Sequence, residues 1–460
     1  MRDLLSIGTS RGCEMIGTGI GLGLSGYRVN PPGVIPVLDL NFASLKSLVA
    51  ATGPTPSFSR ASTGTFFNSS GVLTTAAVNG PRFNHVYNGS SWVSKGLLVE
   101  EQRTNNILRS QDLTVTWTMN RGTISSNAAV APDGTTTADR FVENTANGVH
   151  GPVQTPVTTS AAAYTASGFF KAGSRSVIVI RFQDYDTGAN GVGAEFNLSA
   201  GTISSPAVVI GAFTSPSATI SNVGGGWYRC TVTGTANTTQ CSFRVEACTT
   251  AGAFSAGSFA GSIYTGDGAS YFDSWGYQLE LGSFPTSYIP TTTAAVTRSA
   301  DVCQITGSAF TNLWNATEGS FSVDNDRLGS VTSSFSSGFP HSLSLVDGSN
   351  LVRMGFYGGH SGASPTGEIF LYNGSSRITA GSLVSGSNPI KISGAYKAND
   401  FAASLNGAAS LTSSSGALET VVQMNIGAWA SSQYMLNGHI ARIRYYPNRL
   451  TNAKLQELST

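Results

Sequence analysis

The stretch GGGWYRCTVTG (224–234) indicates the fold class, because its apolar and polar side chains alternate. Successive side chains of an extended strand point to opposite faces of a sheet. Tyr228, Cys230 and Val232 would therefore share one face, and the arginine and threonines between them would share the other. This alternation is typical of a strand that buries one face in a hydrophobic core, so we expect a half-buried β-strand here.

Short strand candidates of the same kind recur on both sides of this stretch, with Gly, Asn, Asp or Ser between them. They are DRFVEN (139–144), AYTASGFFKAG (163–173), SVIVIRFQD (176–184), GAEFNLSAG (193–201), CSFRVEAC (241–248) and SYFDSWGYQLELG (270–282). Many short strands at regular spacing predict a sandwich or barrel. We expect one β-sandwich over residues 108–293.

Residues 294–460 repeat this pattern without repeating the sequence, and we expect a second sandwich there. GSFSVDND (319–326) would bury Phe321 and Val323, and PIKISGAYKANDFAASLNGAASL (389–411) is expected to form a hairpin. In GHIARIRYYPNRL (438–450), we expect Ala441, Ile443 and Tyr445 to face inward. The proline in this last stretch would end the strand, because it cannot donate to the ladder.

The chain is expected to begin with two non-sandwich segments. Residues 1–35 are glycine-rich with little to bury, and predict an arm; residues 36–107 predict a small β connector. Within the connector, FASLKSLVA (42–50) would place Leu45, Leu48 and Val49 on one helical face. At the other end, Thr451 is a suitable N-cap for a short helix.

The composition supports a mostly β protein. Charged residues make up 11% of the 460 residues, there are 54 glycines, and the net charge is +1. Low charge and many hydroxyl and amide side chains suit strands and turns better than helices. We expect no nucleic-acid partner, because no block of like charge occurs, and no membrane span, because the apolar runs are short. The first residues are a poor signal peptide, which is consistent with release by cell lysis.

The five cysteines do not form a zinc pattern. If WYRCTVT (227–233) and CSFRVEA (241–247) formed a hairpin, Cys230 would lie opposite Arg244 rather than Cys241. We therefore expect free thiols. Cys13, in the glycine-rich arm, is the cysteine that we would expect to pair with another chain.

Two stretches resemble a segment common in tail-fibre, head-fibre and minor structural proteins of tailed bacteriophages. They are SFSRASTGTFFNSSGVLTTAAVNGPRFNHVYNGSSWVSKGLLVEEQRTN (57–105) and YTGDGASYFDSWGYQLELGSFPTSYIPTTTAAVTRSAD (264–301). Between them, PDGTTTADRFVEN (132–144), FFKAG (169–173), FNLSAGT (196–202) and GGGWYRCTVT (224–233) are similar to the carbohydrate-binding jelly-roll module of those proteins. KISGAYKANDFAASLNG (391–407) and GHIARIRYYPNRLTNAKLQEL (438–458) resemble a concanavalin A-like or laminin-G-like sandwich.

The resemblance, which covers about residues 57–460, implies a virion location, a pair of lectin-like β-sandwiches and a homotrimer. We expect the N-terminal region to anchor the chain to another virion protein, whether of the capsid, neck or tail. Cys13, Gly17, Gly19 and Tyr27 are the anchoring candidates in the arm.

Motifs for enzymatic chemistry lack their structural context. GTSRG (8–12) fits the nucleophile-elbow pattern around Ser10, but no core strand precedes it. GTGIGLGLSG (17–26) lacks the Lys-Ser/Thr of a phosphate-binding loop. A glycoside hydrolase needs two carboxylates facing one sugar bond, and Glu100 and Glu101 would point to opposite faces of a strand. We therefore expect a protein that is not an enzyme.

Two carboxylate pairs could hold Ca²⁺ with nearby carbonyl oxygens. Asp184 and Asp186 would share a face in QDYDTGAN (183–190), and Asp324 and Asp326 would share a face in VDND (323–326). We prefer solvated turns for both pairs, so calcium stays an open alternative and no other cofactor is expected.

Exposed aromatic rings are the most useful signal for glycan binding, because sugars stack their C–H faces on them. Six tryptophans are candidates, namely Trp92, Trp117, Trp227, Trp275, Trp314 and Trp429, although Trp227 and Trp275 fall in strand patterns that favour core packing. Tyr185, in the loop after an apolar strand, and Tyr357, before GGHSG, are the preferred glycan-binding candidates.

Together these patterns predict a fibre-like or decoration protein of a phage virion that either binds host-surface glycan or braces the particle. The alternatives are a polysaccharide-depolymerising tailspike and a purely structural decoration protein without glycan binding.

Overall fold

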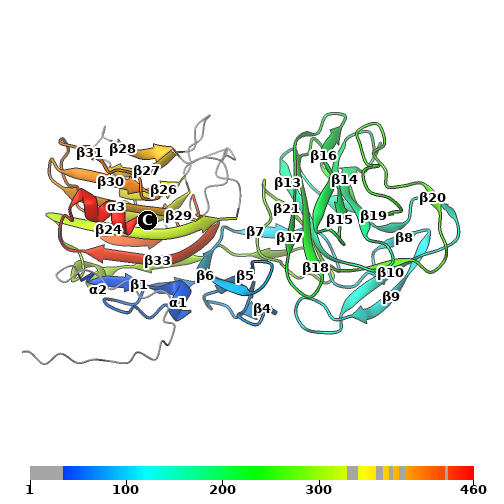
Figure 1. Cartoon of the computed structure of the whole chain (residues 1–460), viewed down its shortest axis with the longest axis horizontal. Helices are drawn as coiled ribbons and strands as arrows, with labels where there is room; N and C mark the ends of the chain where they lie inside the picture. The colour runs from blue at the N-terminus through cyan, green and yellow to red at the C-terminus, as the bar shows by residue number, and fades with distance from the viewer. Residues whose placement is uncertain (1–34, 329–339, 359–365, 372–376, 383–388, 430–433) are drawn as a thin grey trace, which may run out of the picture. The chain divides into compact units, whose positions relative to one another are not determined.

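The computed structural model describes residues 35–328, 340–358, 366–371, 377–382, 389–429 and 434–460. The arm candidates Cys13, Gly17, Gly19 and Tyr27, together with Ser10, lie outside these residues. The protein is mostly β, with antiparallel sheets throughout, as predicted (Figure 1).

The first sandwich consists of two six-stranded sheets. One sheet is ordered β17 (Thr214–Asn222), β18 (Trp227–Thr235), β13 (Ala163–Ala172), β21 (Tyr271–Leu281), β10 (Ala138–Glu143) and β9 (Gly122–Ala129). The other is ordered β16 (Thr202–Ile210), β15 (Gly191–Asn197), β14 (Val177–Asp184), β19 (Gln240–Cys248), β12 (Gly151–Thr158) and β8 (Thr118–Asn120). The strands of this sandwich lie between Thr118 and Leu281.

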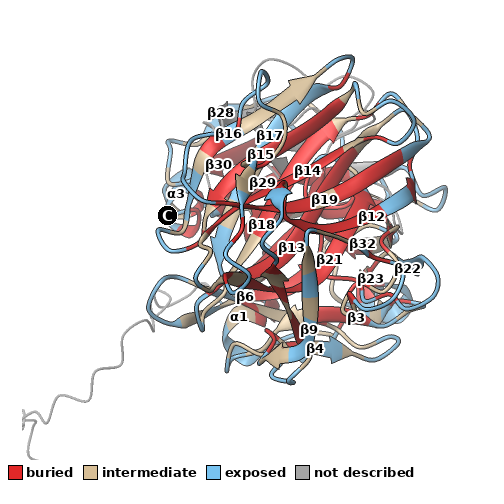
Figure 2. Ribbon diagram, turned by 90° about the vertical axis from the view of Figure 1, so that its right-hand side faces the viewer, coloured by how far each residue is buried: buried red, intermediate tan, exposed pale blue. Residues whose placement is uncertain are grey.

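The core of this sandwich confirms the alternation read from β18. Cys230 and Val232 are fully buried, and Tyr228 packs against the same core from a half-buried position. Phe170 and Phe243 reach this core from opposite sheets, and each lies within 6 Å of Tyr277. Full burial of each such side chain contributes about 1.5–3 kcal/mol. In Figure 2, buried residues follow these strands and exposed residues occupy most of the connecting loops.

Residues 227–233 and 241–247 do not pair with each other as a hairpin. β18 pairs with β13 and β17, whereas β19 pairs with β14 and β12 in the other sheet. Both strands turn an apolar face to the same core, so the connection between them crosses the sandwich. Cys230, Cys241, Cys248 and Cys303 are free and buried, as expected.

The second sandwich also consists of two sheets. The eight-stranded sheet is ordered β31 (Leu411–Ser413), β30 (Phe401–Leu405), β29 (Ile390–Lys397), β24 (Glu318–Arg327), β33 (Gly438–Tyr446), β6 (Trp92–Val99) and β5 (Phe83–Tyr87), and β1 (Leu38–Leu40) also pairs with β33. The seven-stranded sheet is ordered β2 (Ser57–Ser59), β23 (Val302–Ile305), β32 (Gln423–Ile426), β25 (His341–Val346), β26 (Val352–Gly358), β27 (Thr366–Leu371) and β28 (Arg377–Ser382).

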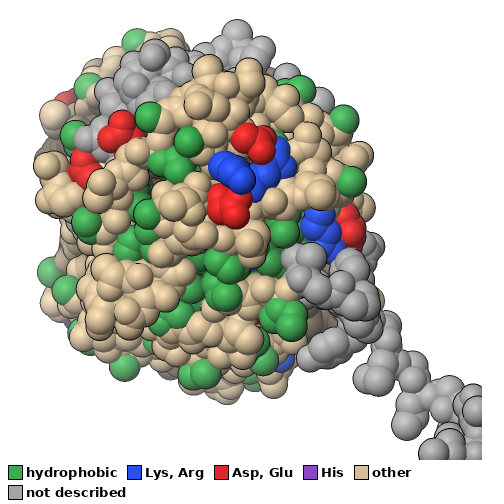
Figure 3. Space-filling model, turned by 90° about the vertical axis from the view of Figure 1, so that its left-hand side faces the viewer, with side chains coloured by type: hydrophobic (Ala, Val, Ile, Leu, Met, Phe, Trp, Pro, Cys, Tyr) green, Lys and Arg blue, Asp and Glu red, His purple; other side chains and the backbone are tan. Residues whose placement is uncertain are grey.

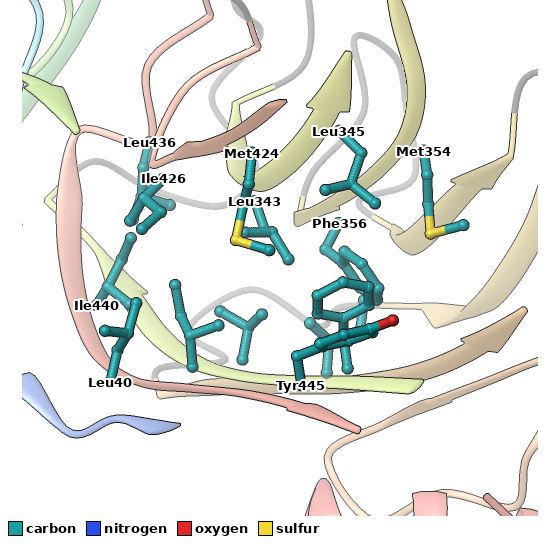
Figure 4. Close-up of a cluster of buried hydrophobic side chains, with 14 of the residues drawn as sticks. Leu40, Leu343, Leu345, Met354, Phe356, Met424, Ile426, Leu436, Ile440 and Tyr445 are labelled. Atoms are coloured by element: carbon teal, nitrogen blue, oxygen red, sulfur yellow. The ribbon is translucent and has the colours of Figure 1, made fainter. Parts of the chain in front are cut away.

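Side chains from both sheets meet in one hydrophobic core (Figure 4). Leu343 and Met424 come from the seven-stranded sheet, and Ile440 and Tyr445 come from the eight-stranded sheet. Phe321 and Val323 are fully buried in this core, and β29 and β30 form the expected hairpin.

The boundary between the connector and the second sandwich differs from the prediction. β1, β5 and β6, all within residues 36–107, are strands of the eight-stranded sheet, and β2 belongs to the seven-stranded sheet. These segments complete a sheet edge and bury Leu38, Leu40 and Leu97 in its core. Residues 36–107 are therefore built into the second sandwich rather than forming a separate connector.

The remaining strands of the described residues form three two-stranded sheets. They are β3 (Gly64–Phe67) with β4 (Leu73–Ala76), β7 (Arg103–Asn105) with β22 (Val296–Arg298), and β11 (Asn147–Gly148) with β20 (Tyr264–Thr265). The helices described are α1 (Phe42–Leu45), α2 (Gly307–Thr311) and α3 (Asn452–Leu458), and none is long and apolar enough to cross a bilayer.

Two local predictions fail and one is confirmed. The helix expected over residues 42–50 ends at Leu45, because Lys46 is left-handed, and Val49 is exposed. The alternation in β33 is interrupted by a register shift at Ala441, so Ile440 joins Ile443 in the core. Thr451 caps α3 by accepting a hydrogen bond from the Lys454 amide, as predicted.

The low charge of the sequence is visible on the surface. The face in Figure 3 consists mainly of uncharged polar side chains and backbone, with a few charged groups.

Candidate functional site

A cavity of about 850 Å³ lies against the outer face of β17 and β18. Most of its lining comes from three parts of the chain: the strands β3, β5 and β6, the outer face of β17 and β18, and residues 283–288. This volume falls within the usual range of sites that bind small ligands. The cavity is the candidate functional site.

One wall of the cavity is a row of hydroxyl groups. Thr231 and Thr233 are the positions of β18 that alternate with its core residues, and Thr219 and Ser217 lie opposite them on β17. The Oγ1 atoms of Thr219 and Thr231 are 2.5 Å apart. Because each hydroxyl both donates and accepts, this wall can bind the hydroxyl groups of a sugar.

The facing wall is aromatic. The Trp92 ring centroid lies 4.9 Å from that of Phe67 and 5.6 Å from that of Tyr87. All three side chains are half-buried and line the cavity. Flat rings of this kind provide the apolar contact that the C–H faces of a sugar need.

Glycines on two different segments make room for the Trp92 ring. Gly71 has a φ of +78°, and a Cβ there would lie 2.1 Å from Trp92 Nε1. A Cβ on Gly224, in the turn between β17 and β18, would lie 3.5 Å from Trp92 Cζ2. The ring therefore packs between a turn of the β3–β4 hairpin and a turn of the first sandwich.

Arg229 is the cation among the residues that line the cavity. Its Nη2 donates a hydrogen bond to Ser167 Oγ at 3.1 Å, and its guanidinium carbon lies 5.5 Å from the centre of the Phe169 ring. Burial lowers the pKa of Arg229, and the negative charges of Glu280 and Glu100 partly oppose this effect. Arg229 thus has a guanidinium in a largely dry environment.

A buried ion network forms the end of the cavity where residues 283–288 lie. Arg82 contacts Glu100 Oε2 and Asp301 Oδ2, each at 2.6 Å, and Arg60 contacts Asp301 Oδ1 at 3.0 Å. Ser287 donates from both its amide and its hydroxyl to Glu100, at 2.7 Å each. These hydrogen bonds satisfy charged groups that would otherwise be costly to bury.

The network holds Glu100 in its ionised form. Burial alone would raise the pKa of Glu100, but Arg298, Arg82 and the hydrogen bonds from Ser287 hold it well below its usual range. A general acid in glycoside hydrolysis needs a raised pKa and a second carboxylate across the sugar bond. Glu100 is the acidic residue among the described residues that line the cavity.

A second polar cluster reaches the cavity through His439 and Asn84. Asn84 Oδ1 accepts from the Phe67 amide at 2.8 Å, so its Nδ2 donates to His439 Nε2 at 2.8 Å. The Nδ1–H of His439 then donates to Asp326 Oδ1 at 2.6 Å. This chain of hydrogen bonds fixes the imidazole tautomer, and both ring nitrogens of His439 have a hydrogen-bond partner.

The predicted metal candidates have other roles. Asp184 is buried, and its carboxylate accepts hydrogen bonds from Thr187, Gly188 and Asn190 in its own loop. Strand β14 ends at Asp184, so Asp186 does not share its face, and Asp186 is exposed. Within the described residues, no three His, Cys, Asp or Glu side chains are grouped so that they could hold a metal ion.

The prediction of a solvated turn for Asp324 and Asp326 is wrong. Both residues lie within β24, and Asp326 is buried beside His439 and Lys95. Burial raises the pKa of Asp324, although Arg444 and Lys391 oppose the effect. The two aspartates are therefore strand residues with cationic neighbours.

The predicted glycan-binding tyrosines are not brought to the cavity by the described structure. Tyr185 is 45% exposed in the loop after β14, and does not line the cavity. The Tyr357 backbone belongs to β26 rather than to a loop, and its side chain lies outside the described residues.

The tryptophans differ in whether they are buried in a core or line the cavity. Trp227 and Trp275 are buried in a small core with Phe169 and Tyr288, as the strand pattern predicted. Trp92 is one of the six tryptophan candidates from the sequence, and it is the tryptophan among the described residues that lines the cavity. A sequence signal could have singled out Trp92: it is the first residue of a strand and directly follows the turn NGSS (88–91), so it lies at the end of a sheet.

The fold and the cavity define a protein of two β-sandwiches with a polar and aromatic pocket beside the first. No protein-family model matches the sequence, and no curated protein matches it either.

Solved structures give only distant likeness. The extracellular region of zebrafish Gpr126/Adgrg6 is 10% identical, covers 74% of this chain and 37% of that chain, and has a TM-score of 0.22. Domains LG4-5 of the mouse laminin α1 chain are 11% identical, with coverages of 66% and 89% and a TM-score of 0.20. A Trypanosoma rangeli sialidase in complex with sialic acid is 10% identical, with coverages of 89% and 99% and a TM-score of 0.24. The present chain thus spans about a third of the zebrafish region, and TM-scores this low do not carry an argument about function.

Proposed function

We propose that this chain is a glycan-binding structural protein of a tailed-phage virion, and that its glycan site is the cavity between the hydroxyl wall and the aromatic wall. The observation that carries the glycan part is that one cavity is lined both by hydroxyl groups, such as those of Thr219 and Thr231, and by aromatic rings, such as that of Trp92. Sugars need both kinds of contact, because their rings have apolar faces and polar edges.

Binding, rather than depolymerisation, is the function that the cavity supports. Glu100 accepts from Ser287 and forms ion pairs with Arg82 and Arg298, and its lowered pKa keeps it from acting as a proton donor near neutral pH. A cavity whose one carboxylate is ionised and paired with arginines suits a ligand that is bound and not cleaved.

The virion part of the proposal rests on the resemblance of residues 57–105 and 264–301 to phage fibre and minor structural proteins. In this proposal the N-terminal region attaches the chain to another virion protein, and the chain assembles as a homotrimer. Cryo-electron microscopy of the purified virion tests both points. Density for this chain in threefold copies on the particle is the expected result, and absence of the chain from purified particles contradicts the proposal.

A glycan array with the full chain and two variants tests the binding site. Trp92→Ala removes from the aromatic wall the ring that contacts the other two, and Tyr185→Ala removes the exposed ring that the sequence favoured. We expect Trp92→Ala to weaken glycan binding at least tenfold and Tyr185→Ala to retain it, since one stacked ring contributes a large share of such contacts. The opposite pattern would move the site to the loop after β14. Binding of no glycan by the wild-type chain contradicts a glycan-binding function.

A further inference from the structure

We propose that the glycan bound in this cavity carries a carboxylate, as a hexuronic acid does, and that Arg229 binds that carboxylate. The inference rests on the proposed function and names the class of its ligand. It comes from the side chain of Arg229, whose guanidinium makes one hydrogen bond and no ion pair with the described residues.

Arg229 has donors that the described residues do not use. Its Nη2 bonds to Ser167, and its Nη1 makes no hydrogen bond to a described residue; its Nε also has no partner, but it is buried. In the part of the chain that the structure describes, no carboxylate lies within 4.0 Å of this guanidinium, whereas Arg82, Arg60 and Arg298 all have such a partner. The two Nη groups are therefore the donors that a ligand in the cavity would meet.

The charges around Arg229 also leave room for an anion. Arg229 belongs to a set of charged groups that interact electrostatically with one another. The set contains the guanidiniums of Arg60, Arg82, Arg229 and Arg298 and the carboxylates of Glu100, Glu280 and Asp301. The oxygens of Glu280 are already occupied by Thr286 and Gln278. Arg229 is the member of this set without a carboxylate within 4.0 Å among the described residues, and it is the arginine that lines the cavity.

The position of Arg229 suits an acidic sugar in particular. It lies on the outer face of β18, with Ser221 opposite it on β17 and Thr231 two residues along the same face. A guanidinium binds a carboxylate through two parallel hydrogen bonds, and the adjacent hydroxyls can bind the ring hydroxyls of the same sugar. A simple inorganic anion would leave these hydroxyls and the aromatic wall unused.

A paired glycan array tests the inference. It prints each uronic-acid-containing glycan beside the same glycan with its carboxyl groups reduced to alcohols, and adds sulfated and phosphorylated glycans as a third group. We expect the wild-type chain to bind at least one uronic-acid glycan tenfold or more tightly than its reduced counterpart. We expect Arg229→Gln to abolish this preference and Arg229→Lys to keep part of it, because lysine retains the charge but not the two-pronged geometry.

Arg244→Gln is the matched control. Arg244 lies on β19 in the opposite sheet, is half-buried, and also has an Nε without a partner among the described residues, but it does not line the cavity. Its variant should keep the wild-type preference. A readout based on the ratio of acidic to reduced glycan is insensitive to a general loss of folded protein.

The outcomes separate this inference from the proposed function. Equal binding of reduced and acidic glycans that is lost in Trp92→Ala leaves the glycan site standing and overturns the role of Arg229. Preference for sulfated or phosphorylated glycans over uronic acids also overturns the carboxylate assignment. Failure of the wild-type chain to bind any glycan overturns both.

Discussion

Arg82 and Asp301 are 219 positions apart in the sequence, yet Nη2 of the arginine lies 2.6 Å from Oδ2 of the aspartate in a site without solvent exposure. Arg60 and Glu100 join the same network. All four residues belong to two stretches of the chain, residues 57–105 and 264–301. The physical role of those stretches in this chain is thus to meet in a buried ion network at the end of the cavity.

Replacing Asp301 by asparagine should destabilise the protein strongly. The change leaves Arg60 and Arg82 without their shared charge partner, and breaking a buried ion pair from one side costs about 3–5 kcal/mol. Urea unfolding followed by tryptophan fluorescence measures this loss. Asp186→Asn, an exposed aspartate in a loop, is the control and should change stability by less than about 0.5 kcal/mol. A similar small effect for both variants would show that the network does not support the fold.

Replacing Thr231 by valine should weaken glycan binding without unfolding the protein. Valine has nearly the same shape, and it removes a hydroxyl that lines the cavity and contacts Thr219. Loss of one neutral hydrogen bond of about 0.5–1.5 kcal/mol corresponds to a roughly three- to tenfold weaker Kd. Titration calorimetry with a glycan identified on the array measures this change.

Thr202→Val provides the comparison for this prediction. Thr202 is an exposed threonine at the start of β16 in the opposite sheet, and it does not line the cavity. Its variant should bind as the wild type does. Unchanged affinity for Thr231→Val would mean that the hydroxyl wall does not contact the ligand.

Local patterns predicted those features that depend on neighbouring residues. The burial of Phe321 and Val323, the hairpin of β29 and β30, and the Thr451 cap follow from strand alternation and helix capping. The strand membership of residues 36–107 does not follow from such patterns, since Leu38 pairs with Tyr445 at the far end of the chain.

The cavity escaped prediction for the same reason. Its walls come from segments around residues 66–92, 215–235 and 283–288, and no local pattern reveals that they meet. The sequence did place Arg229 and Thr231 on the polar face of a strand, which is where the structure has them. The sequence could not show that this polar face lines a cavity together with aromatic rings from other segments.

The carboxylate of Asp184 should make the stability of the first sandwich pH-dependent. Burial opposes its ionisation, but hydrogen bonds from Thr187, Asn190 and Gly188 lower the pKa of Asp184 to about 2 from an ordinary value of 3.8. A lowered folded-state pKa means that its stabilisation is complete above pH 4 and is lost as the pH falls toward 2. The expected loss over this range is about 2 kcal/mol.

Unfolding of wild type and Asp184→Asn at several pH values between 7 and 2 measures this effect. The variant replaces one accepting oxygen by an amide group that meets the donors of Asn190, so it should be less stable at pH 7. The two proteins should approach each other in stability as the pH falls to 2, where about half of Asp184 is protonated. A stability difference that stays constant with pH would mean that the charge of Asp184 does not stabilise the loop.

The buried cysteines should resist alkylation in the native protein. Burial raises the pKa of Cys241 and Cys248 to about 11 each, and Cys230 and Cys303 are likewise buried with raised pKa values. Since the thiolate is the reacting species, their reaction with iodoacetamide at pH 7.5 should be slower than that of a free thiol by a hundredfold or more. Peptide mass spectrometry after timed labelling measures each site separately, and the same labelling in urea, where all sites should react, is the control. Rapid native labelling of Cys241 would show that β19 opens at its β12 edge, and it would contradict the closed core on which the cavity wall of β18 rests.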